Sequence, residues 1–412
     1  MKVLLVNKFL YPKGGDAIST LTTGSLLSSK GHKVSFWGMD HPSNPEYPLK
    51  RCFVKHVDFN NPYKKQNQLK AALNILYSFE AKRKMEEVIK IEKPDIVHLN
   101  NFAHQISPSI LHVFRKHHIP VVMTMRDYKL VCPVHSMLRE GKPCEKCKGG
   151  RYHHCFLNNC TKNSRVKSLI NILEMYLHHK ILHIYDLVDV YISPSRFLKS
   201  KVEEMGLKGK VVHLFNFVSL DDCRPQYEFI EKSIVYAGRL SHEKGLFTLI
   251  EAMKGLDVKL KIIGDGPLMQ GLGDRVAGLG LKNVEFLGYK TGEEFKNEIK
   301  KSMFVVLPSE CYENNPRSVI ESFALGKPVV GAQIGGIPEL VKDGKTGLTF
   351  EAGNVGDLRS KIETLLLNTE NIVSMGRNAR AFVEKEFNSE THYVRLLDIY
   401  QQAKIHQERR SV

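Results

Sequence analysis

Two basic residues follow a short apolar segment in the second half of the chain, at a spacing that suits an anionic ligand. The segment SIVYA ends just before GRLSHEKG, in which Arg239 and Lys244 stand five positions apart. If SIVYA is a parallel strand, both side chains lie at the carboxyl end of a sheet, where α/β proteins bind ligands. A guanidinium fork and a lysine point charge can together neutralise a diphosphate. Two solvated basic residues in a loop are the alternative interpretation.

Two glutamates eight positions apart form a second pattern, in ECYENNPRSVIES. Asn315 and Pro316 favour the start of a helix there, because Asn caps a helix and Pro suits its first turn. The unpaired N–H groups and the dipole of that turn make an anion site. Glu313 lies just before this helix and Glu321 lies on it. One carboxylate can accept hydrogen bonds from a sugar and the other from a ribose, although glutamates at this spacing are common in any protein.

Short apolar segments alternate with helical ones around these residues. The expected strands are KVLLVN, KVSFWG, IVHL, VVMTM and DVYISPS in the first half, and SIVYAGRL, VKLKIIGDG, VEFLGY, MFVVLPS and PVVGA in the second. Such alternation predicts parallel sheets with helices on both faces. A chain of 412 residues suits two such domains. We predict domains at 1–220 and 230–385, a polar linker near 219–232, and a helical tail at 386–412.

The chain carries a formal charge of +16, and this charge is unevenly distributed. Residues 115–170 hold twelve Lys or Arg and three Asp or Glu. A basic surface of this size implies an anionic partner, either nucleic acid, anionic lipid or a phosphorylated glycan. No helix-turn-helix, zinc-finger or aromatic RNA-binding pattern favours nucleic acid. Lys64, Lys65, Lys70 and the run Lys82–Lys84 also suit an anionic membrane, or they simply form solvated faces.

The N-terminal sequence MKVLLVNKFLYPKGG predicts a strand and not a signal peptide. It has no small-residue cleavage site and runs directly into Gly14 and Gly15. No apolar run in the chain approaches the ~20 residues that a membrane-spanning helix needs. We therefore expect a cytoplasmic protein, with peripheral attachment to the inner face of the cytoplasmic membrane as an open alternative.

Five of the eight cysteines fall close together, in a basic insert at about 130–162. Disulfides are rare in the cytoplasm, so the cluster predicts a metal site first. The expected ligands are Cys132, Cys144, Cys147 and Cys160. Four thiols with one Cys-x-x-Cys pair suit tetrahedral Zn²⁺, which would be structural and would brace a loop with little apolar content. The alternate ligands are Cys155, His135, His153 and His154. An iron–sulfur cluster and unligated thiols are the other interpretations.

Several segments, taken in order, resemble the retaining glycosyltransferases of family 4, which have the GT-B fold. The matching segments are VN…PKGG, YAGRLSHEKG, IIGDGP, VEFLGY, ENNPRSVIESFALGKPVVG and GGIPELVKDGKTGL, which together span nearly the whole chain. The resemblance implies two Rossmann-like domains whose parallel sheets face each other across a cleft, with the C-terminal helix packing back toward the first domain. It also implies metal-independent transfer from a nucleoside-diphosphate sugar, a UDP-sugar being favoured over a GDP-sugar.

The same resemblance assigns roles to residues of both domains. The implied catalytic residues are Asp127, Arg239, Lys244 and Glu313, and the implied donor-binding residues are Gly14, Gly15, Asn314, Asn315 and Glu321. By this resemblance the two cations hold the diphosphate, Glu313 contacts the donor sugar and Glu321 binds ribose. Preorganised cations and helix N–H groups would stabilise the leaving group without a divalent ion. Because both domains contribute, we expect closure to accompany binding.

One position departs from the family pattern. Members often carry His-Asp after the fourth strand of the first domain, and here Arg126 precedes Asp127. Arg126 has two open interpretations, which are binding of an anionic acceptor or sugar carboxylate and pairing with a neighbouring acid. His98 and His104 precede it in VHLNNFAHQ and are further candidates on the acceptor side, although a lone histidine there is more often structural.

The function that we predict is transfer of a sugar to a glycan or a lipid-linked glycan in surface polysaccharide synthesis, with no nucleic-acid partner. A catalytically inactive nucleotide-sugar-binding scaffold and a GT-B sugar-nucleotide epimerase are rivals. Turnover that requires an acceptor separates the transferase from both. A nucleic-acid binder is a third rival, and steep salt dependence of DNA or RNA binding would identify it.

Overall fold

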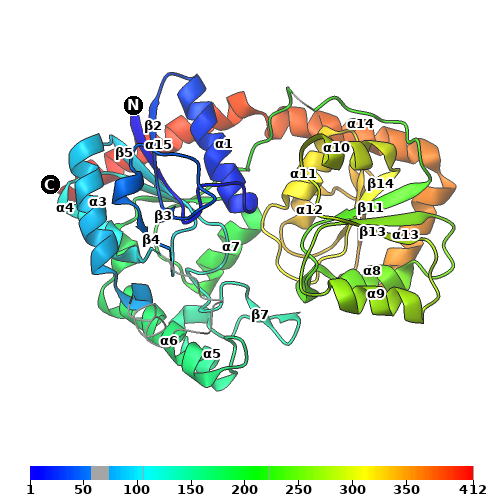
Figure 1. Cartoon of the computed structure of the whole chain (residues 1–412), viewed down its shortest axis with the longest axis horizontal. Coiled ribbons are helices and arrows are strands. Elements are labelled where there is room, and N and C mark those ends of the chain that lie inside the picture. Colours follow the sequence, from blue (N-terminus) through cyan, green and yellow to red (C-terminus); the bar gives the residue numbers. More distant parts are fainter. Residues whose placement is uncertain (57–73, 105, 222, 412) are drawn as a thin grey trace.

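The computed structural model describes residues 1–56, 74–104, 106–221 and 223–411, and within them the chain forms two six-stranded sheets (Figure 1). The first sheet has the order β10-β9-β6-β5-β1-β2 and the second the order β13-β12-β11-β14-β15-β16. Neighbouring strands pair in parallel throughout both sheets. The predicted fold, two Rossmann-like domains, is confirmed. Lys64, Lys65 and Lys70 lie outside the described residues.

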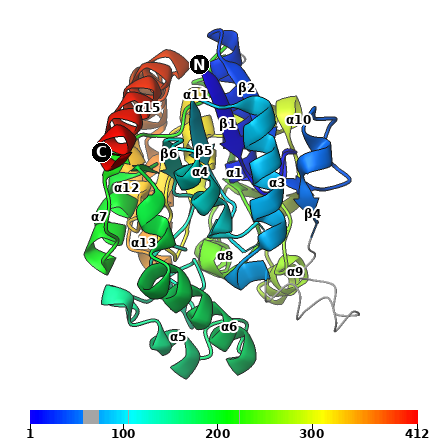
Figure 2. The ribbon, with the colours of Figure 1, turned by 90° about the vertical axis from the view of Figure 1, so that its left-hand side faces the viewer.

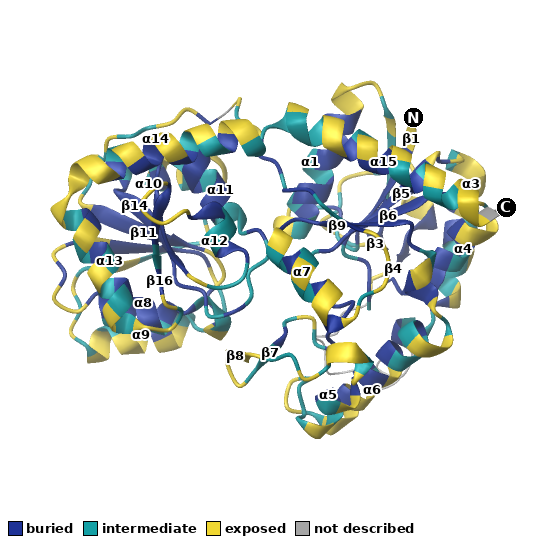
Figure 3. Ribbon diagram, turned by 180° about the vertical axis from the view of Figure 1, so that it is seen from behind, coloured by how far each residue is buried: buried dark blue, intermediate teal, exposed yellow. Residues whose placement is uncertain are grey.

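The first sheet is built from short apolar segments in the first half of the chain. Its strands are β1 (Lys2–Val6), β2 (Lys33–Trp37), β5 (Ile96–Leu99), β6 (Val121–Thr124), β9 (Val190–Ser193) and β10 (Val211–His213). Its helices are α1 (Gly15–Ser29), α3 (Phe79–Glu92), α4 (Leu111–Lys116) and α7 (Arg196–Met205), and β3 (Met39–Asp40) pairs with β4 (Val54–Lys55) beside them. The inner strands β5, β6 and β9 are buried along their whole length, as parallel strands covered on both faces should be (Figure 3).

The cysteine-rich insert follows β6. Its elements are β7 (Leu138–Arg139), which pairs antiparallel with β8 (Lys142–Pro143), then α5 (His153–Leu157) and α6 (Arg165–Tyr176). Helix α6 continues into a π-helical turn, η4 (Leu177–Ile181). Two perpendicular views place α5 and α6 at one extremity of the first domain, away from its sheet (Figures 1 and 2).

The second domain repeats the alternation of strand and helix. Its strands are β11 (Ser233–Ala237), β12 (Lys259–Ile263), β13 (Val284–Gly288), β14 (Phe304–Leu307), β15 (Val329–Ala332) and β16 (Gly347–Phe350). Its helices are α8 (Leu246–Ala252), α9 (Met269–Gly278), α10 (Gly292–Lys301), α11 (Arg317–Ala324), α12 (Ile337–Leu340) and α13 (Val355–Leu367). One continuous apolar core joins these elements.

The last two helices cross from the second domain back to the first (Figure 1). Helix α14 (Thr369–Glu386) lies on the second domain, and α15 (Ser389–Ser411) packs on the first sheet, where Leu396, Ile399 and Tyr400 are buried against its strands. The predicted return of the C-terminal helix to the first domain is therefore confirmed. The domain limits at 220, 230 and 386 stay a prediction. Among the described residues, no helix combines the length and the apolar character that a membrane span requires.

Candidate active site between the two domains

Lys244 and Glu313 contact each other at the carboxyl end of the second sheet. Lys244 ends the short turn η6 (His242–Lys244) after β11, and Glu313 lies in the loop between β14 and α11. Lys244 Nζ donates to Glu313 Oε1 at 2.5 Å, and Ser309 Oγ donates to the same oxygen at 2.6 Å. Burial alone would lower the pKa of Lys244, but the adjacent Glu313 carboxylate raises that pKa above its ordinary value. The two residues therefore form an ionised pair.

The position of Lys244 depends on the glycine that follows it. Gly245 has a φ of +66°, and a Cβ at this position would stand 1.9 Å from the carbonyl oxygen of Pro308. Only glycine allows the two loops to approach so closely. Arg239, five positions before Lys244, has an exposed side chain, and its carbonyl accepts a hydrogen bond from Tyr236 Oη at 2.8 Å. Our sequence analysis gave Gly245 no role, although its place directly after a predicted phosphate ligand was a usable signal.

Asn314 and Asn315 join the second domain to the first. Asn314 Oδ1 accepts a hydrogen bond from Ser195 Oγ at 2.8 Å, at the start of α7. Asn315 Oδ1 accepts from Asn216 Nδ2 at 3.0 Å, just after β10. The loop before α11 is thus held against two elements of the first domain. Both asparagines were predicted from the resemblance to bind the donor, and in the structure their side chains form hydrogen bonds between the domains.

Arg126 lies in the same network. Its Nη2 donates to Asn100 Oδ1 at 2.7 Å, and its Nη1 donates to Asn216 Oδ1 at 2.7 Å. Burial lowers its pKa to about 10, so the guanidinium stays charged at neutral pH. The hydrogen bonds of Arg126 go to amide oxygens and not to the neighbouring acid considered above. Sequence reasoning missed Asn100 and Asn216; each follows a strand end, which was the available signal.

The N-terminus of α1 faces α11 across the domain boundary. A Cβ on Gly15 would lie 3.5 Å from Arg317 Cδ. Gly14 caps α1 in an extended conformation, without a side-chain hydrogen bond. Arg317 Nη2 donates to Glu321 Oε1 at 3.0 Å, so the carboxylate predicted to bind ribose is already paired within α11. Arg317 is a further site-lining residue that sequence reasoning did not identify.

Asp127 lies at the end of β6, next to Arg126. Its Oδ1 accepts a hydrogen bond from the backbone N–H of Lys129 at 2.9 Å. Lys8, after β1, lies near Asp127 and Asp16; burial lowers the pKa of Lys8, while these two carboxylates oppose the shift. We refer to Arg126, Asp127, Lys244, Glu313 and the loop 313–316 as the interdomain site.

His98 does not reach the interdomain site. Its Nδ1 is 2.8 Å from Tyr400 Oη and its Nε2 is 2.7 Å from Thr124 Oγ1, so helix α15 and strand β6 engage both ring nitrogens. Burial lowers the pKa of His98 to about 3, which keeps the ring neutral. The position of His98 does not support the acceptor role predicted for it, because both hydrogen-bonding atoms are used inside the first domain.

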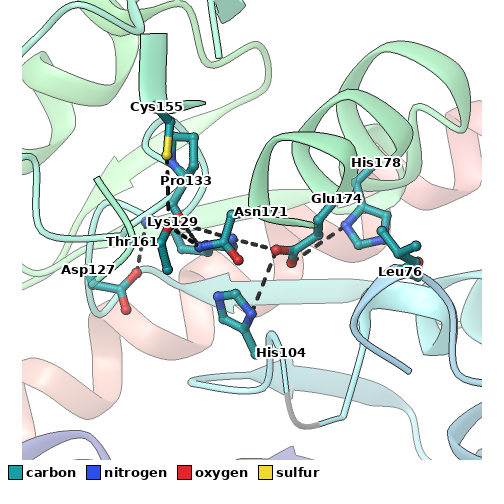
Figure 4. Close-up of polar contacts among 10 residues, drawn as sticks. All are labelled: Leu76, His104, Asp127, Lys129, Pro133, Cys155, Thr161, Asn171, Glu174 and His178. Atoms are coloured by element: carbon teal, nitrogen blue, oxygen red, sulfur yellow. Dashed lines mark hydrogen bonds and ion pairs between the residues drawn. The ribbon is translucent and has the colours of Figure 1, made fainter. Parts of the chain in front are cut away.

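His104 belongs to a buried network centred on Glu174 (Figure 4). Glu174, on α6, is fully buried; Lys129 Nζ donates to its Oε2 at 2.7 Å, and His104 Nδ1 lies 3.6 Å from the same oxygen. His178 Nδ1 lies 3.9 Å from the other oxygen. Burial lowers the pKa of His104 to about 3. His104 therefore helps to anchor the insert beneath the loop that carries Asp127, and it does not point into the interdomain site.

The cysteines of the insert gather around one small pocket. Its lining includes Cys132, Cys144, Cys147, Cys155 and Cys160, with Pro133, Val134, Met137, Leu138 and Met205. Burial and the neighbouring thiols raise the pKa of Cys147 to about 12. In the part of the chain that the structure describes, no three His, Cys, Asp or Glu side chains are arranged to hold a metal ion as they stand. The four predicted ligands are therefore brought together, and the zinc itself stays a prediction.

The insert also touches the interdomain site directly. Glu145, between Cys144 and Cys147, accepts a hydrogen bond from Tyr312 Oη at 2.9 Å and one from Lys201 Nζ at 2.7 Å. Tyr312 precedes Glu313 in the chain. The insert therefore contacts the loop of the second domain that carries Glu313.

Two family models match the chain. Residues 13–222 match the model described as Glycosyltransferase Family 4, and residues 226–382 match the model described as Glycosyl transferases group 1. The first match alone covers half of the 412 residues. Gly14, Gly15, Arg126 and Asp127 lie within the first matched range, and Lys244 and Glu313 lie within the second.

Among similar sequences, an uncharacterized glycosyltransferase of Methanocaldococcus jannaschii is 30% identical over 52% of this chain and 60% of that protein. An uncharacterized 42.6 kDa protein in the cps region of Klebsiella pneumoniae is 30% identical over 82% of this chain and 87% of that protein. Among solved structures, sucrose-phosphate synthase from Thermosynechococcus elongatus has a TM-score of 0.71 at 17% identity, over 97% of this chain and 98% of that one. Anabaena HepE in complex with UDP-glucose has a TM-score of 0.66 at 18% identity, over 97% and 99% of the two chains.

Proposed function

Because the chain belongs to the glycosyltransferases of group 1 and family 4, we propose that it moves a sugar, with retained anomeric configuration, from a nucleoside-diphosphate donor to a glycan or lipid-linked glycan. The observation that carries the proposal is the ionised Lys244–Glu313 pair at the carboxyl end of the second sheet. Surface polysaccharide synthesis is the proposed context, supported by the location of the Klebsiella relative in a cps region. A cytoplasmic location is part of the same proposal.

In this proposal Lys244 and Arg239 hold the diphosphate, and Glu313 contacts the donor sugar. Lys244 is preorganised by Glu313, which also accepts a hydrogen bond from Ser309, so little reorganisation is needed when the phosphate binds. The cations neutralise the charge that develops on the leaving diphosphate, so no divalent ion is needed for that step. The bound UDP-glucose of HepE supports a nucleotide-sugar donor, and a UDP-sugar is favoured over a GDP-sugar.

Glu321 is proposed to bind the donor ribose after its ion pair with Arg317 breaks. Both side chains are partly exposed, at 22% for Arg317 and 30% for Glu321. An exposed i,i+4 pair is worth only about 0.3–0.5 kcal/mol, so a ribose can displace Arg317 at small cost. Gly14 and Gly15 let the first domain approach the donor from the opposite side. Asp127 and Arg126 are proposed to face the acceptor.

Calorimetric titration with UDP, GDP and ADP in EDTA tests the donor site. We expect one diphosphate to bind without metal, and Arg239→Ala/Lys244→Ala to weaken it by about 100-fold or more, because each lost charge-assisted contact is worth ~1.5–3 kcal/mol. Lys254→Ala/Lys282→Ala is the matched control for a change of two charges and should bind as the wild type does. Equal binding by the Arg239/Lys244 variant would place the donor elsewhere.

Turnover separates the proposed transferase from its rivals. A transferase releases nucleotide and forms product with retained configuration only when acceptor is present, and NMR of the product reports that configuration. Product formed without acceptor would favour the epimerase. Nucleotide binding without any turnover would favour the inactive scaffold.

We further propose that the cysteine pocket holds a structural Zn²⁺ after its thiols draw together. Its five thiols and apolar walls suit a closed site with four Cys ligands. Elemental analysis of the protein is expected to find one zinc per chain, lost in Cys144→Ser/Cys147→Ser and kept in Cys52→Ser, whose cysteine does not line the pocket. Well-folded protein without zinc would contradict the proposal and favour unligated thiols.

A further inference from the structure

An apolar stripe faces outward on helix α6 of the insert. Val166 is 70% exposed, Leu169 42% and Leu173 49%. Positions i, i+3 and i+7 share one side of a helix, so these three side chains form a continuous strip. The opposite side of α6 carries Ser168, Asn171, Ile172 and Met175, which are buried. The exposed side of α6 thus carries an apolar strip, which a helix side that faces only water would not need.

Two further exposed apolar side chains lie on elements that contact α6. Leu157, at the end of α5, is 67% exposed, and Ile181, at the end of η4, is 68% exposed. Residues 157–181 thus hold five of the thirteen strongly exposed large apolar side chains in the described part of the chain. Such concentration in one short stretch marks an interaction surface, since single exposed apolar residues are normally scattered.

Basic residues are concentrated in the same segment of the chain as the stripe. Between positions 146 and 185 there are seven Lys or Arg, and Glu174 is the one acidic residue. The seven are Lys146, Lys148, Arg151, Lys162, Arg165, Lys167 and Lys180. Since Glu174 is fully buried, no acidic side chain of this stretch reaches the surface. Among the described ion pairs, Lys148 alone of these seven has an acidic partner, Glu204. The remaining six therefore present uncompensated positive charge.

We propose that the exposed side of α5, α6 and η4, called the α6 face, docks on an anionic lipid bilayer. Aliphatic side chains that enter the headgroup boundary, flanked by Lys and Arg that contact anionic headgroups, are what an interfacial helix presents to a membrane. Long basic side chains suit this position because their stems stay apolar while their charges reach the headgroups. A nucleic-acid backbone would use the charge but would leave the aliphatic stripe in water.

The α6 face belongs to the same insert that borders the interdomain site. Glu145 contacts Tyr312 from the insert, and Glu174 ties α6 to the loop carrying Asp127. Docking through α6 would therefore bring the proposed acceptor side near the bilayer, which is where a lipid-linked acceptor resides. The role of docking in reaching a lipid-linked acceptor rests on the proposed function, whereas docking on the bilayer does not.

Co-sedimentation of the full chain with vesicles tests the inference. We expect binding to phosphatidylcholine vesicles that contain phosphatidylglycerol, weakened by high salt, and little binding to phosphatidylcholine alone. Arg165→Glu/Lys167→Glu should lower the partition coefficient by roughly tenfold or more, since each basic residue contributes about fivefold near an anionic surface. Val166→Ser/Leu173→Ser should lower it by roughly tenfold through lost apolar burial.

Matched controls come from the far side of the molecule. Leu367→Ser/Val394→Ser removes one leucine and one valine that are as strongly exposed, and Lys282→Glu/Lys345→Glu reverses two exposed charges in the second domain. Both controls should bind vesicles as the wild type does. The inference would be overturned if the controls lost as much vesicle binding as the α6 variants, or if the two α6 variants bound vesicles as the wild type does. It would also be overturned if the α6 variants lost affinity for DNA but kept their affinity for vesicles.

Nucleotide titration keeps this test separate from the proposed function. The α6 variants should bind the nucleoside diphosphate with wild-type affinity, because the α6 face contributes no residue to the Lys244–Glu313 pair. Vesicle binding that depends on α6 in a protein that binds no nucleotide would support the membrane surface and contradict the transferase. If the protein binds nucleotide but the α6 variants bind vesicles as the wild type does, the result would support the donor site and contradict the membrane surface.

Discussion

Glu313→Gln is expected to lower the rate of sugar transfer by about 100- to 1,000-fold while leaving the affinity for the free nucleoside diphosphate equal or higher. The two effects differ in sign because Glu313 has two partners. Its carboxylate accepts a hydrogen bond from Lys244 Nζ at 2.5 Å, and in the proposed function it also contacts the donor sugar. A phosphate must share that ammonium with Glu313, so neutralising the carboxylate frees Lys244 for the phosphate. The donor sugar, in contrast, loses the carboxylate that accepts its hydrogen bonds during transfer.

Nucleotide release in the presence of acceptor and titration with the free diphosphate measure the two effects on one protein. Glu310→Gln is the control, since it removes the same charge three positions away, where Glu310 Oε1 accepts a hydrogen bond from Thr248 Oγ1 at 2.6 Å. It should change the transfer rate by less than about threefold, as expected of a residue outside the site. A transfer rate in Glu313→Gln within that same range would remove Glu313 from the reaction.

The second large effect is expected inside the insert, from Lys129→Met. This change leaves Glu174 as a buried carboxylate without the ammonium that lies 2.7 Å away. Breaking one side of a buried pair costs about 3–5 kcal/mol, which corresponds to a fall of roughly 10 °C in the melting midpoint of a domain this size. Lys129→Met/Glu174→Leu removes both charges and should recover at least half of that loss. Thermal melting followed by circular dichroism measures all three proteins.

A surface pair provides the comparison. Lys50→Met breaks an exposed contact with Glu46 at 2.9 Å and should shift the melting midpoint by no more than about 1–2 °C. If Lys129→Met melts like Lys50→Met, the network of Figure 4 is not the anchor of the insert. If the double variant is no better than the single one, the loss reflects packing and not an uncompensated charge.

The pH dependence of stability gives an independent check on Glu174. Burial alone would raise its pKa, but the ammonium of Lys129 lowers it below the ordinary value. A carboxyl with a depressed folded-state pKa contributes stability that is fully present above its unfolded pKa, about 4.3, and is lost as the pH falls through the folded value. Lys129→Met/Glu174→Leu should therefore lose less stability than the wild type when the pH is lowered from neutral through that range.

The sequence by itself determined the two parallel sheets, most strand positions and the approximate place of the residues proposed to bind the donor. These properties are local, because a parallel strand buried on both faces must be a short apolar run. Arg239, Lys244 and Glu313 could be placed because each follows such a run, and parallel strands end at a common edge. The insert was visible for a similar reason, since its cysteines and basic residues are concentrated in one segment.

Only the tertiary structure decided which partners these residues meet. Arg126 bonds to Asn216, Lys129 to Glu174, and Glu145 to Tyr312. These partners stand 90, 45 and 167 positions apart, so no local pattern could pair them. His98 shows the same limit, because the residue that occupies its Nδ1 is Tyr400, on a helix that returns from the second domain. Periodicity reports which side chains are buried, but the packing of distant elements decides what they touch there.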